Sequence, residues 1–574
     1  MTPCDVVLVG YEDEENLGLR SIAAYLARDG VKVELAPYRA GVRDRLLALL
    51  RARRSRLVGF SLIFQGMLPD FADLIAFLRA NGVQAHFTMG GHFPSIAWER
   101  TLALIPGLDT VVRHEGEVTL FELLRSLDRP AEWSRIPGLA FRREGRATAT
   151  PARPLVANLD DLPVPLRRGG TLAARGVGIA SLVASRGCFY DCSFCSIRRF
   201  YGEPPGPLRR TRSPGNVAGE MESLFRKNGV RVFIFKDDDL ATRGTRARAW
   251  IEAFAGELEA RGLAPRIAWR ISCRVDDLDV PLLRRLQRVG LTWVYLGIES
   301  GSDQGLRTFN KRFRVADVHV GLARLRRLGL AFDYGFMLLD PGSTIGSVRE
   351  SIGFLEDIGR RGDVAVHFTK MYPYVGTPVA ARLAAEGRLA GTDAAPDYSF
   401  RDRRLDLFQG FLSEAFHERN FGAEGLVGVG RMAAFDLELI TRFGNGGRAD
   451  ASYSRTIRRT TAEGNLVATS AMRLALSAIE ARSATQCVAA WPYLQEIARI
   501  ARETDRRLAR RLKGVMHAHG YDEPHIVRRA PHPDRATTGG IHDERADGRQ
   551  GQDRVRAAQR ATGTSGMHRA LGSR

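Results

Sequence analysis

Short apolar runs alternate with helix-type stretches along the first part of the chain. Runs of six to eight mostly apolar residues begin at positions 5, 32, 56, 85 and 110, and stretches with apolar residues three or four positions apart begin at 19, 46, 70 and 119. The short runs predict buried strands, and the wider spacing predicts amphipathic helices. Their regular alternation indicates an α/β fold with a parallel sheet covered on both faces, a Rossmann-like layer.

A second alternation begins at residue 179. Six further apolar runs cover residues 179–186, 231–237, 266–273, 292–299, 332–339 and 364–371, with helix-type stretches between them. Six successive strand–helix units predict a partial (βα)6 barrel of the TIM type. We expect its chemistry at the carboxyl ends of the strands.

Beyond about residue 395 the strand signal stops and long amphipathic stretches follow. We expect them to form a helical substrate or lid domain over the barrel mouth, where it would exclude water from reactive intermediates. The last segment lacks apolar periodicity and predicts disorder. The expected division is residues 1–150 for the Rossmann-like domain, 151–178 for a linker, 179–394 for the barrel, 395–526 for the helical domain and 527–574 for a disordered basic tail.

Composition narrows the class of protein. Hydrophobic residues make up 44% of the chain, and no apolar run approaches the roughly 18 residues that a membrane span needs. The first residues read as a strand rather than a signal peptide, so we expect a cytoplasmic protein with no membrane partner. The net charge of +20 comes from arginines spread over separate segments, and this pattern does not favour a nucleic-acid groove.

Three of the six cysteines lie within eight positions, at Cys188, Cys192 and Cys195. A structural zinc site needs four ligands, commonly as two pairs, and no second pair lies nearby, so zinc is the weaker alternative. Three thiolates can instead hold three irons of a [4Fe–4S] cluster and leave the fourth iron open for a substrate or cofactor. An open iron implies catalysis.

C-x3-C-x2-C with Phe194 before its last cysteine resembles the signature of the radical S-adenosylmethionine (SAM) enzymes. The resemblance continues through Asp237-Asp238-Asp239, the run Gly297 to Ser300 and the PYVGTP stretch that begins at Pro373. It implies that SAM chelates the open iron and is cleaved to a 5′-deoxyadenosyl radical. By position, the implied SAM contacts are Asp237 or Asp238 for the ammonium, Arg274 for the carboxylate, and Glu299 or Ser300 for the ribose. A solvated acidic turn and a barrel-edge ion pair are the alternatives.

The order of the domains resembles the cobalamin-binding radical SAM subfamily. The corrin would then lie at strand ends of the first domain. The candidate contacts are Gly10, Ser61, Gly90, Gly91, Glu115 and Gly116, which are otherwise ordinary loop residues. The D-x-H-x-x-G motif that supplies a lower cobalt ligand in many cobalamin proteins is absent, which suggests cobalt without a protein histidine below it. His92 is the one histidine considered as a cobalt ligand, and a loop residue hydrogen-bonded to backbone is the simpler interpretation.

The resemblance implies a cobalamin-dependent C-methyltransferase. One SAM would methylate cobalamin, a second would yield the radical that abstracts hydrogen, and the substrate radical would take the methyl group from methylcobalamin. The expected substrate is a small-molecule or carrier-bound secondary-metabolite intermediate, as in antibiotic biosynthesis, and a low-potential flavodoxin or ferredoxin would donate the electron. Tyr372 is the candidate catalytic residue that contacts the substrate, with barrel-rim packing as the alternative.

Three alternatives stay open at this point. A non-methylating cobalamin enzyme would carry out ring contraction, cyclisation or oxygenation. An RNA-modifying enzyme would suit the basic charge, but no basic stripe with interleaved aromatic residues is present. A metal-stabilised binding protein would need a fourth cluster ligand, for which Cys273 is the candidate, although packing in the barrel is its simpler role.

Overall fold

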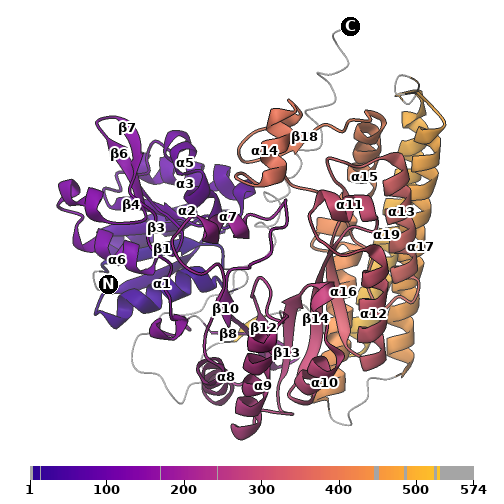
Figure 1. Cartoon of the computed structure of the whole chain (residues 1–574), viewed down its shortest axis with the longest axis horizontal. Helices are drawn as coiled ribbons and strands as arrows, with labels where there is room; N and C mark the ends of the chain where they lie inside the picture. The colour runs from indigo at the N-terminus through magenta and orange to yellow at the C-terminus, as the bar shows by residue number, and fades with distance from the viewer. Residues whose placement is uncertain are drawn as a thin grey trace.

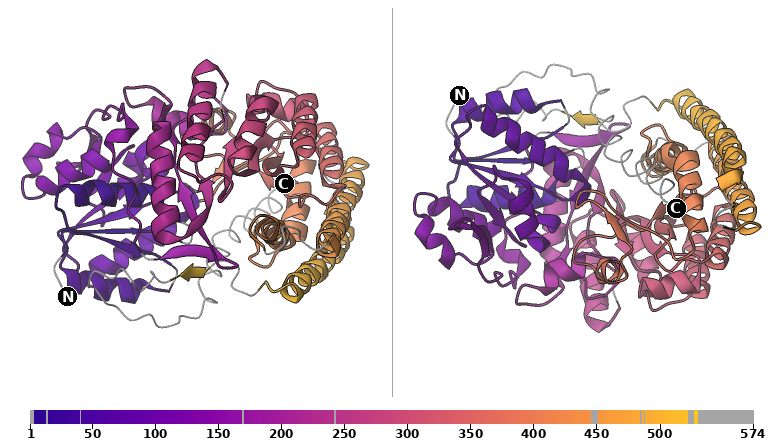
Figure 2. Two further views of the ribbon diagram at one scale, coloured as in Figure 1. Left: turned by 90° about the horizontal axis from the view of Figure 1, so that it is seen from below. Right: turned by 90° about the horizontal axis from the view of Figure 1, so that it is seen from above.

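The computed structural model describes residues 4–12, 15–39, 41–168, 170–241, 243–444, 451–483, 486, 488–521 and 527–529. The amino-terminal α/β domain, the barrel and the long carboxyl-terminal helices follow one another across the molecule (Figure 1). Views from below and above place the amino-terminal sheet on one side and the last long helices as the outer wall on the other (Figure 2).

The amino-terminal domain is a seven-stranded sheet with the strand order β2-β1-β3-β4-β5-β6-β7. The first five strands are parallel, as the alternation predicts, and a hairpin of β6 and β7 adds an antiparallel edge that it does not predict. The strands are β1 (Val6–Gly10), β2 (Val33–Pro37), β3 (Leu57–Ser61), β4 (His86–Gly90), β5 (Thr110–Val112), β6 (Leu139–Arg143) and β7 (Arg146–Ala149). The helices are α1 (Leu17–Arg28), α2 (Arg43–Arg53), α3 (Leu68–Ala80), α4 (His92–Ile96), α5 (Trp98–Leu104) and α6 (Glu117–Arg125).

The barrel domain is built on an eight-stranded sheet with the order β16-β15-β14-β13-β12-β9-β8-β19. Six neighbouring strands are parallel and form the expected partial barrel. They are β9 (Val177–Leu182), β12 (Val230–Phe235), β13 (Ala268–Cys273), β14 (Leu291–Glu299), β15 (Ala331–Leu339) and β16 (Thr369–Lys370). Two short strands, β10 (Ser185–Arg186) and β11 (Arg210–Thr211), flank the cysteine loop.

The barrel helices begin where sequence signals place them. Ser213 caps α8 (Pro214–Asn228) with Pro214 in its first turn, and Gly229 ends it in a left-handed conformation. Thr377, part of the motif PYVGTP, caps α14 (Pro378–Ala385) in the same way. The other helices of this domain are α7 (Ile197–Gly202), α9 (Thr245–Ala260), α10 (Val280–Arg288), α11 (Asp303–Thr308), α12 (Val315–Leu328) and α13 (Ile345–Gly359).

The structure differs from the expected boundaries in two places. The segment expected as a linker contains β8 (Thr171–Ala174), which pairs antiparallel with β9. The first residues of the expected tail form β19 (Val527–Arg529), which pairs with β8. The prediction of disorder for residues 530–574 lies outside the described residues.

The carboxyl-terminal helices are α15 (Arg404–Phe421), α16 (Leu426–Phe443), α17 (Ala451–Glu480) and α19 (Trp491–Ala518). Apolar side chains of α15, α17 and α19 share one core with the barrel. Helix α16 lies against the concave side of the sheet, where Phe435 packs on Trp293 and Leu439 joins residues of β9, β12 and β13. Helix α16 of the helical domain therefore docks on the concave face of the partial barrel. In the described part of the chain, no helix is long and apolar enough to cross a membrane.

Candidate active site

The cysteine loop runs from β10 to α7 and is anchored from below. The Ser193 backbone N–H donates to the Phe309 carbonyl (3.0 Å), its hydroxyl donates to the Thr308 carbonyl (2.7 Å), and the Phe194 ring packs 5.1 Å from Phe309. Gly187 has φ of +83°, and a side chain there would collide with the Leu208 carbonyl. These contacts hold the loop against the barrel through protein groups.

The three thiols are half-buried and lie close enough to influence one another. Burial raises the pKa of Cys188 and of Cys195 to about 12, and neighbouring cysteines and acids add to the shift. A bound cation would therefore be needed to hold them as thiolates. Among the described residues, no three His, Cys, Asp or Glu side chains converge as a single metal ion requires. A cluster that offers each thiolate its own iron does not need that convergence, so the donor set fits a [4Fe–4S] cluster.

The acidic turn after β12 separates its three carboxylates. Asp237 accepts hydrogen bonds from the Ala184 N–H (3.1 Å) and the Ser185 hydroxyl (2.5 Å), which places it in the framework of the loop. Asp238 accepts from the Gly187 N–H (3.2 Å), lines the large cavity described below, and has a pKa raised to about 6 by burial and by Asp237. Of the two predicted ligands for an ammonium group, Asp238 is the one that faces open space.

The other predicted SAM contacts lie close to the cysteine loop. The Arg274 guanidinium is 3.7 Å from the Cys192 sulfur and lies over the Tyr190 ring, while its Nε donates to Asp276 (3.0 Å). Glu299 ends β14 with φ of +70°, and its carboxylate is 3.6 Å from the Lys311 ammonium. Ser300 is buried at the start of the next turn, where its hydroxyl accepts from the Ser302 N–H (3.3 Å). Their contacts to SAM stay predictions.

A cavity of about 1410 Å³ lies between the two α/β domains. Ordinary ligand pockets measure about 300–1,000 Å³, so this one has room for a large cofactor and a second molecule. It is lined by five of the six residues predicted to contact the corrin, namely Ser61, Gly90, Gly91, Glu115 and Gly116. Gly10 does not line it, because its missing side chain makes room for Leu19 and Asn16 of the same domain.

Glycine is required at one point on the cavity wall. Gly91 has φ of +121°, and a β-carbon there would lie 2.0 Å from the Leu62 carbonyl oxygen. The turn therefore brings bare backbone to the end of β4, and the exposed apolar residues Ile63 and Phe64 stand beside it. A flat face of backbone with apolar neighbours at strand ends fits a corrin ring.

The turn Glu115-Gly116-Glu117 joins the two domains. Arg186, two residues before Cys188, donates to Glu115 (3.0 Å) and to Glu117 (2.6 Å). Arg210 donates to both oxygens of Glu115 (2.9 and 3.0 Å). Burial alone would raise the pKa of Glu115, but the two guanidinium groups lower it. The carboxylate of Glu115 is thus engaged by the barrel domain, although sequence reasoning placed it as a cofactor contact.

Two histidines line the cavity, of which sequence reasoning considered only His92. The His92 ring packs on Phe200 (4.5 Å between centroids), and burial lowers its pKa to about 4. His114 has φ of +62° at the end of β5, and burial together with Arg113 lowers its pKa to about 4. Both rings are therefore neutral at pH 7. No motif marks His114 in the sequence, because its place depends on the packing of Phe200 from the other domain.

The loop that lacks the D-x-H-x-x-G histidine holds an ion pair instead. The buried Arg20 donates to Glu12 (2.7 Å), and the Asn16 side chain caps α1. Within the described part of this loop, Tyr11, Glu15 and Asn16 line the cavity. The described part of this loop is thus held by an ion pair and a helix cap of its own residues.

Tyr372 contacts residues outside the cysteine loop. Its hydroxyl donates to the Ala394 carbonyl (2.7 Å), and its ring packs 4.7 Å from Tyr374. Tyr374 is the nearer of the two to the cluster loop, since the Cys195 thiol contributes to its raised pKa. This arrangement matches the rim-packing alternative for Tyr372, and its catalytic role stays a prediction.

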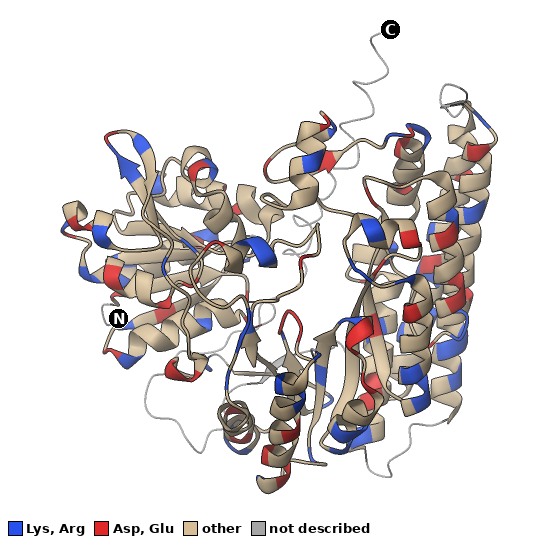
Figure 3. Ribbon diagram, in the orientation of Figure 1, with Lys and Arg blue, Asp and Glu red and all other residues tan. Residues whose placement is uncertain are grey.

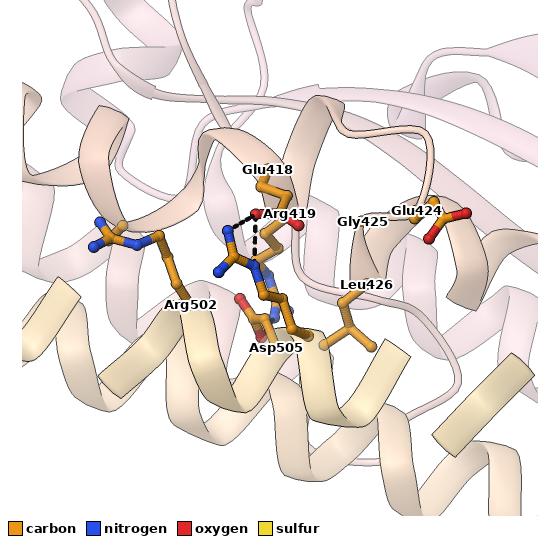
Figure 4. A pocket seen from close by; sticks show the side chains of 9 residues that line it. Glu418, Arg419, Glu424, Gly425, Leu426, Arg502 and Asp505 are labelled. Carbon is orange, nitrogen blue, oxygen red and sulfur yellow. Dashed lines mark hydrogen bonds and ion pairs between the residues drawn. The ribbon is translucent and has the colours of Figure 1, made fainter. Parts of the chain in front are cut away.

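A second pocket, of about 10 Å³, lies between α15, α16 and α19 (Figure 4). It is lined by the buried ion pair of Arg419 and Asp505, whose nearest N and O atoms are 2.5 Å apart. This space holds one water at most. It is a packing feature and not a ligand site.

Comparison with known proteins agrees with this layout. The B12 binding domain family model matches residues 3–124, and the Radical SAM superfamily model matches residues 182–355. The solved cobalamin-dependent S-adenosylmethionine radical enzyme OxsB, with aqua-cobalamin and S-adenosylmethionine bound, superposes with a TM-score of 0.67 at 16% identity, over 91% of this chain and 82% of that chain. The shared fold covers all three domains.

Curated relatives match over about half of the chain. An uncharacterized methyltransferase of Pyrococcus horikoshii is 30% identical over 50% of this chain and 61% of its own length. The anaerobic magnesium-protoporphyrin IX monomethyl ester cyclase of Cereibacter sphaeroides is 30% identical over 44% of this chain and 41% of its own length. The chain thus spans about half the length of these relatives.

The fold and the site define a radical SAM enzyme with a cobalamin-binding domain. The chain belongs to the cobalamin-binding radical SAM superfamily, and its cofactors are a [4Fe–4S] cluster, SAM and cobalamin.

Proposed function

We propose that the protein is a cobalamin-dependent radical SAM methyltransferase that acts on a carbon atom of a small-molecule intermediate, of the kind made in antibiotic biosynthesis. The observation that supports this proposal is the large cavity between the two α/β domains. Its wall includes Ser61 and Gly91 from the cobalamin domain, and Asp238 beside the cysteine loop. A substrate in that space would reach both cofactors without leaving the protein.

The residues present fit the cofactors as follows. Cys188, Cys192 and Cys195 would hold three irons, Asp238 would accept hydrogen bonds from the SAM ammonium, and the backbone at Gly90 and Gly91 would support the corrin. When bound, the cluster and SAM supply a 5′-deoxyadenosyl radical, and cobalamin carries a methyl group from a second SAM to the substrate.

The chain's own residues position the cofactors and the substrate, and they exclude water from the site. Arg186 ties the cysteine loop to the cobalamin domain, and the Phe421 and Ala423 side of the helical domain completes the cavity wall. Enclosure strengthens every polar contact inside and prevents side reactions of a carbon radical. We also propose a cytoplasmic location, a small-molecule or carrier-bound substrate, and a low-potential flavodoxin or ferredoxin as the electron donor.

The test uses full-length protein reconstituted anaerobically with iron, sulfide and hydroxocobalamin, then given SAM and a low-potential reductant. Mass spectrometry quantifies S-adenosylhomocysteine, 5′-deoxyadenosine and methylated cobalamin. We expect all three, with 5′-deoxyadenosine lost in the control that carries alanine at positions 188, 192 and 195. Absence of S-adenosylhomocysteine and methylated cobalamin would end the methyltransferase proposal.

A non-methylating reaction is the second candidate, because one of the two relatives above is a cyclase. It predicts 5′-deoxyadenosine without S-adenosylhomocysteine in the same assay. The two products therefore separate the two candidates in one experiment.

A further inference from the structure

Part of the inner face of the partial barrel, on β13, β14 and β15, is incompletely packed, which is unusual for a parallel sheet. On β13, β14 and β15 the residues that point to the outer helices are buried. Six residues on the opposite, concave face are partly exposed: Arg270, Ser272, Tyr295, Gly297, Asp333 and Gly335. The strand register places these residues in layers, with Arg270 beside Trp293, and Tyr295 beside Ser272 and Asp333. This part of the concave face is therefore less tightly packed than the outer face, and we call the space that it borders the lumen.

The lumen has a floor and a mouth. At the floor, Trp293 packs on Phe435 of α16, with ring centroids 5.3 Å apart. At the mouth, the carboxylate of Glu299 lies next to Gly297 and Gly335. A β-carbon on either glycine would lie about 3 Å from a Glu299 carboxylate oxygen. The Arg274 side chain near Cys192 also bonds the Lys311 carbonyl, and Lys311 faces Glu299. The mouth is thus next to the cysteine loop.

Charged groups crowd around one aromatic ring in this lumen. The pKa of Tyr295 is raised to about 12, mainly by burial and also by Glu299 and Asp333, while Arg431 and Arg270 act in the opposite direction. Both acids are neutralised by partners. Glu299 pairs with Lys311 (3.6 Å), and Asp333 pairs with Arg431 of α16 (2.8 Å).

Arg270 is the third cation of this group. Its guanidinium carbon lies 5.2 Å from the centre of the Tyr295 ring. Among the residues that the structure describes, no carboxylate pairs with it, and its buried Nε has no hydrogen-bond partner. A buried guanidinium donor without an acceptor carries a desolvation penalty, which an anionic ligand would remove. Three cations face two acids here, so the lumen has one positive charge to spare.

We propose that Arg270, on the concave face of the barrel, binds an anionic group of the substrate, a carboxylate or a phosphate. The Arg270 fork suits bidentate binding to either group, and the Tyr295 and Trp293 rings offer an aromatic wall beside it. The inference rests on the proposed function in one respect: the reacting carbon would extend from this anchor toward the mouth, where Arg274 and the cysteine loop lie. Arg270 is then a specificity-determining residue, and the substrate class is anionic.

The test measures binding rather than turnover. Three probes, benzoate, phenylphosphonate and neutral benzamide, are titrated by calorimetry into the anaerobic holoenzyme with cobalamin and SAM present. We expect saturable binding of at least one anion and none of benzamide. Comparison of benzoate with phenylphosphonate tells whether a carboxylate or a phosphate is preferred.

Substitutions locate the binding site. Arg270→Gln should weaken binding of the preferred anion by about tenfold or more, and Arg270→Lys should weaken it less, since the charge is kept but the fork is lost. Arg284→Gln, on the exposed face of α10, is the matched control and should bind like the wild type. Equal iron and cobalamin contents show that the Arg270 variants are folded.

Two outcomes would overturn the inference: no anion binds the wild type, or Arg270→Gln binds as tightly as the wild type. Either outcome is separate from failure of the proposed function, because S-adenosylhomocysteine and 5′-deoxyadenosine are measured on the same preparations without any probe. An enzyme that makes both products but binds no anion keeps its function and loses this substrate class.

Discussion

Two buried ion-pair networks show how differently the molecule uses charge. The network of Glu115, Glu117, Arg186 and Arg210 joins two domains and borders the cavity of about 1410 Å³. The pair of Arg419 and Asp505 joins helices of one domain and borders a space of about 10 Å³. Burial and pairing are similar in the two regions. The two regions differ in open volume and in distance to the cysteines. A buried ion pair therefore indicates a functional site only where open volume and nearby cysteines accompany it.

The rest of the charge is spread over the surface. Basic and acidic residues are interspersed along the outer helices and across the domains (Figure 3). Many form exposed pairs, such as Arg473 with Glu356 and Arg506 with Glu418. Such exposed pairs contribute little to stability individually.

The largest effect on stability is expected from Arg419→Leu. The side chain of Arg419 is fully buried and also donates to the Val366 carbonyl (3.2 Å), so its loss leaves Asp505 without its partner. We expect a loss of about 3–5 kcal/mol in unfolding free energy, measured by denaturant titration. Arg506→Leu breaks a neighbouring exposed pair and should cost less than about 1 kcal/mol. Equal losses for the two variants would contradict the distinction between buried and exposed pairs.

Arg186→Gln should lower the unfolding free energy less than Arg419→Leu does, but it should impair catalysis more. Glu115 keeps Arg210, whereas Glu117 loses its partner, so we expect about 2–3 kcal/mol. Because Arg186 is two residues from Cys188, we also expect a changed electron paramagnetic resonance spectrum of the reduced cluster and less 5′-deoxyadenosine per cluster. Arg226→Gln, in an exposed pair on α8, should change neither. An unaltered cluster spectrum in Arg186→Gln would mean that this network, like the Arg419 pair, contributes only to stability.

The sequence predicts the local features well and the long-range ones poorly. The parallel strands and the cysteine loop follow from short patterns, namely strand–helix alternation and C-x3-C-x2-C. The pairing of Glu115 with Arg186 links residues 71 positions apart, and nothing in either neighbourhood specifies it. The same holds for α16 on the concave side of the barrel and for β8 and β19 at its edge, since β-pairing and helix docking depend on tertiary contacts.

A third prediction uses pH to separate the two regions. An unfolded histidine takes up a proton near pH 6.5, whereas buried His114 does so only near pH 4. Between these values the unfolded state binds more protons, so stability falls as pH decreases. At pH 5 the loss from His114 should be about 2 kcal/mol relative to pH 7, and His114→Gln should remove it.

His517→Gln, on the exposed face of α19, is the control in the other region. The measurement is the unfolding free energy of each variant at pH 5 and pH 7. A pH dependence that is unchanged in His114→Gln would show that this imidazole titrates normally in the folded protein.

The smallest effect on stability is expected at the cavity wall itself. Phe64 is 55% exposed beside the end of β3, and Leu474 is 52% exposed on α17, so alanine at either position should change stability by less than about 0.5 kcal/mol. Only Phe64 lines the cavity, and a bound corrin would cover its ring. Phe64→Ala should therefore raise the dissociation constant for hydroxocobalamin about threefold to tenfold, measured from its visible absorbance, with no change for Leu474→Ala. Unchanged affinity in Phe64→Ala would mean that the corrin lies on another part of the cavity wall, and the distinction between the two regions would then rest on Arg186 and His114 alone.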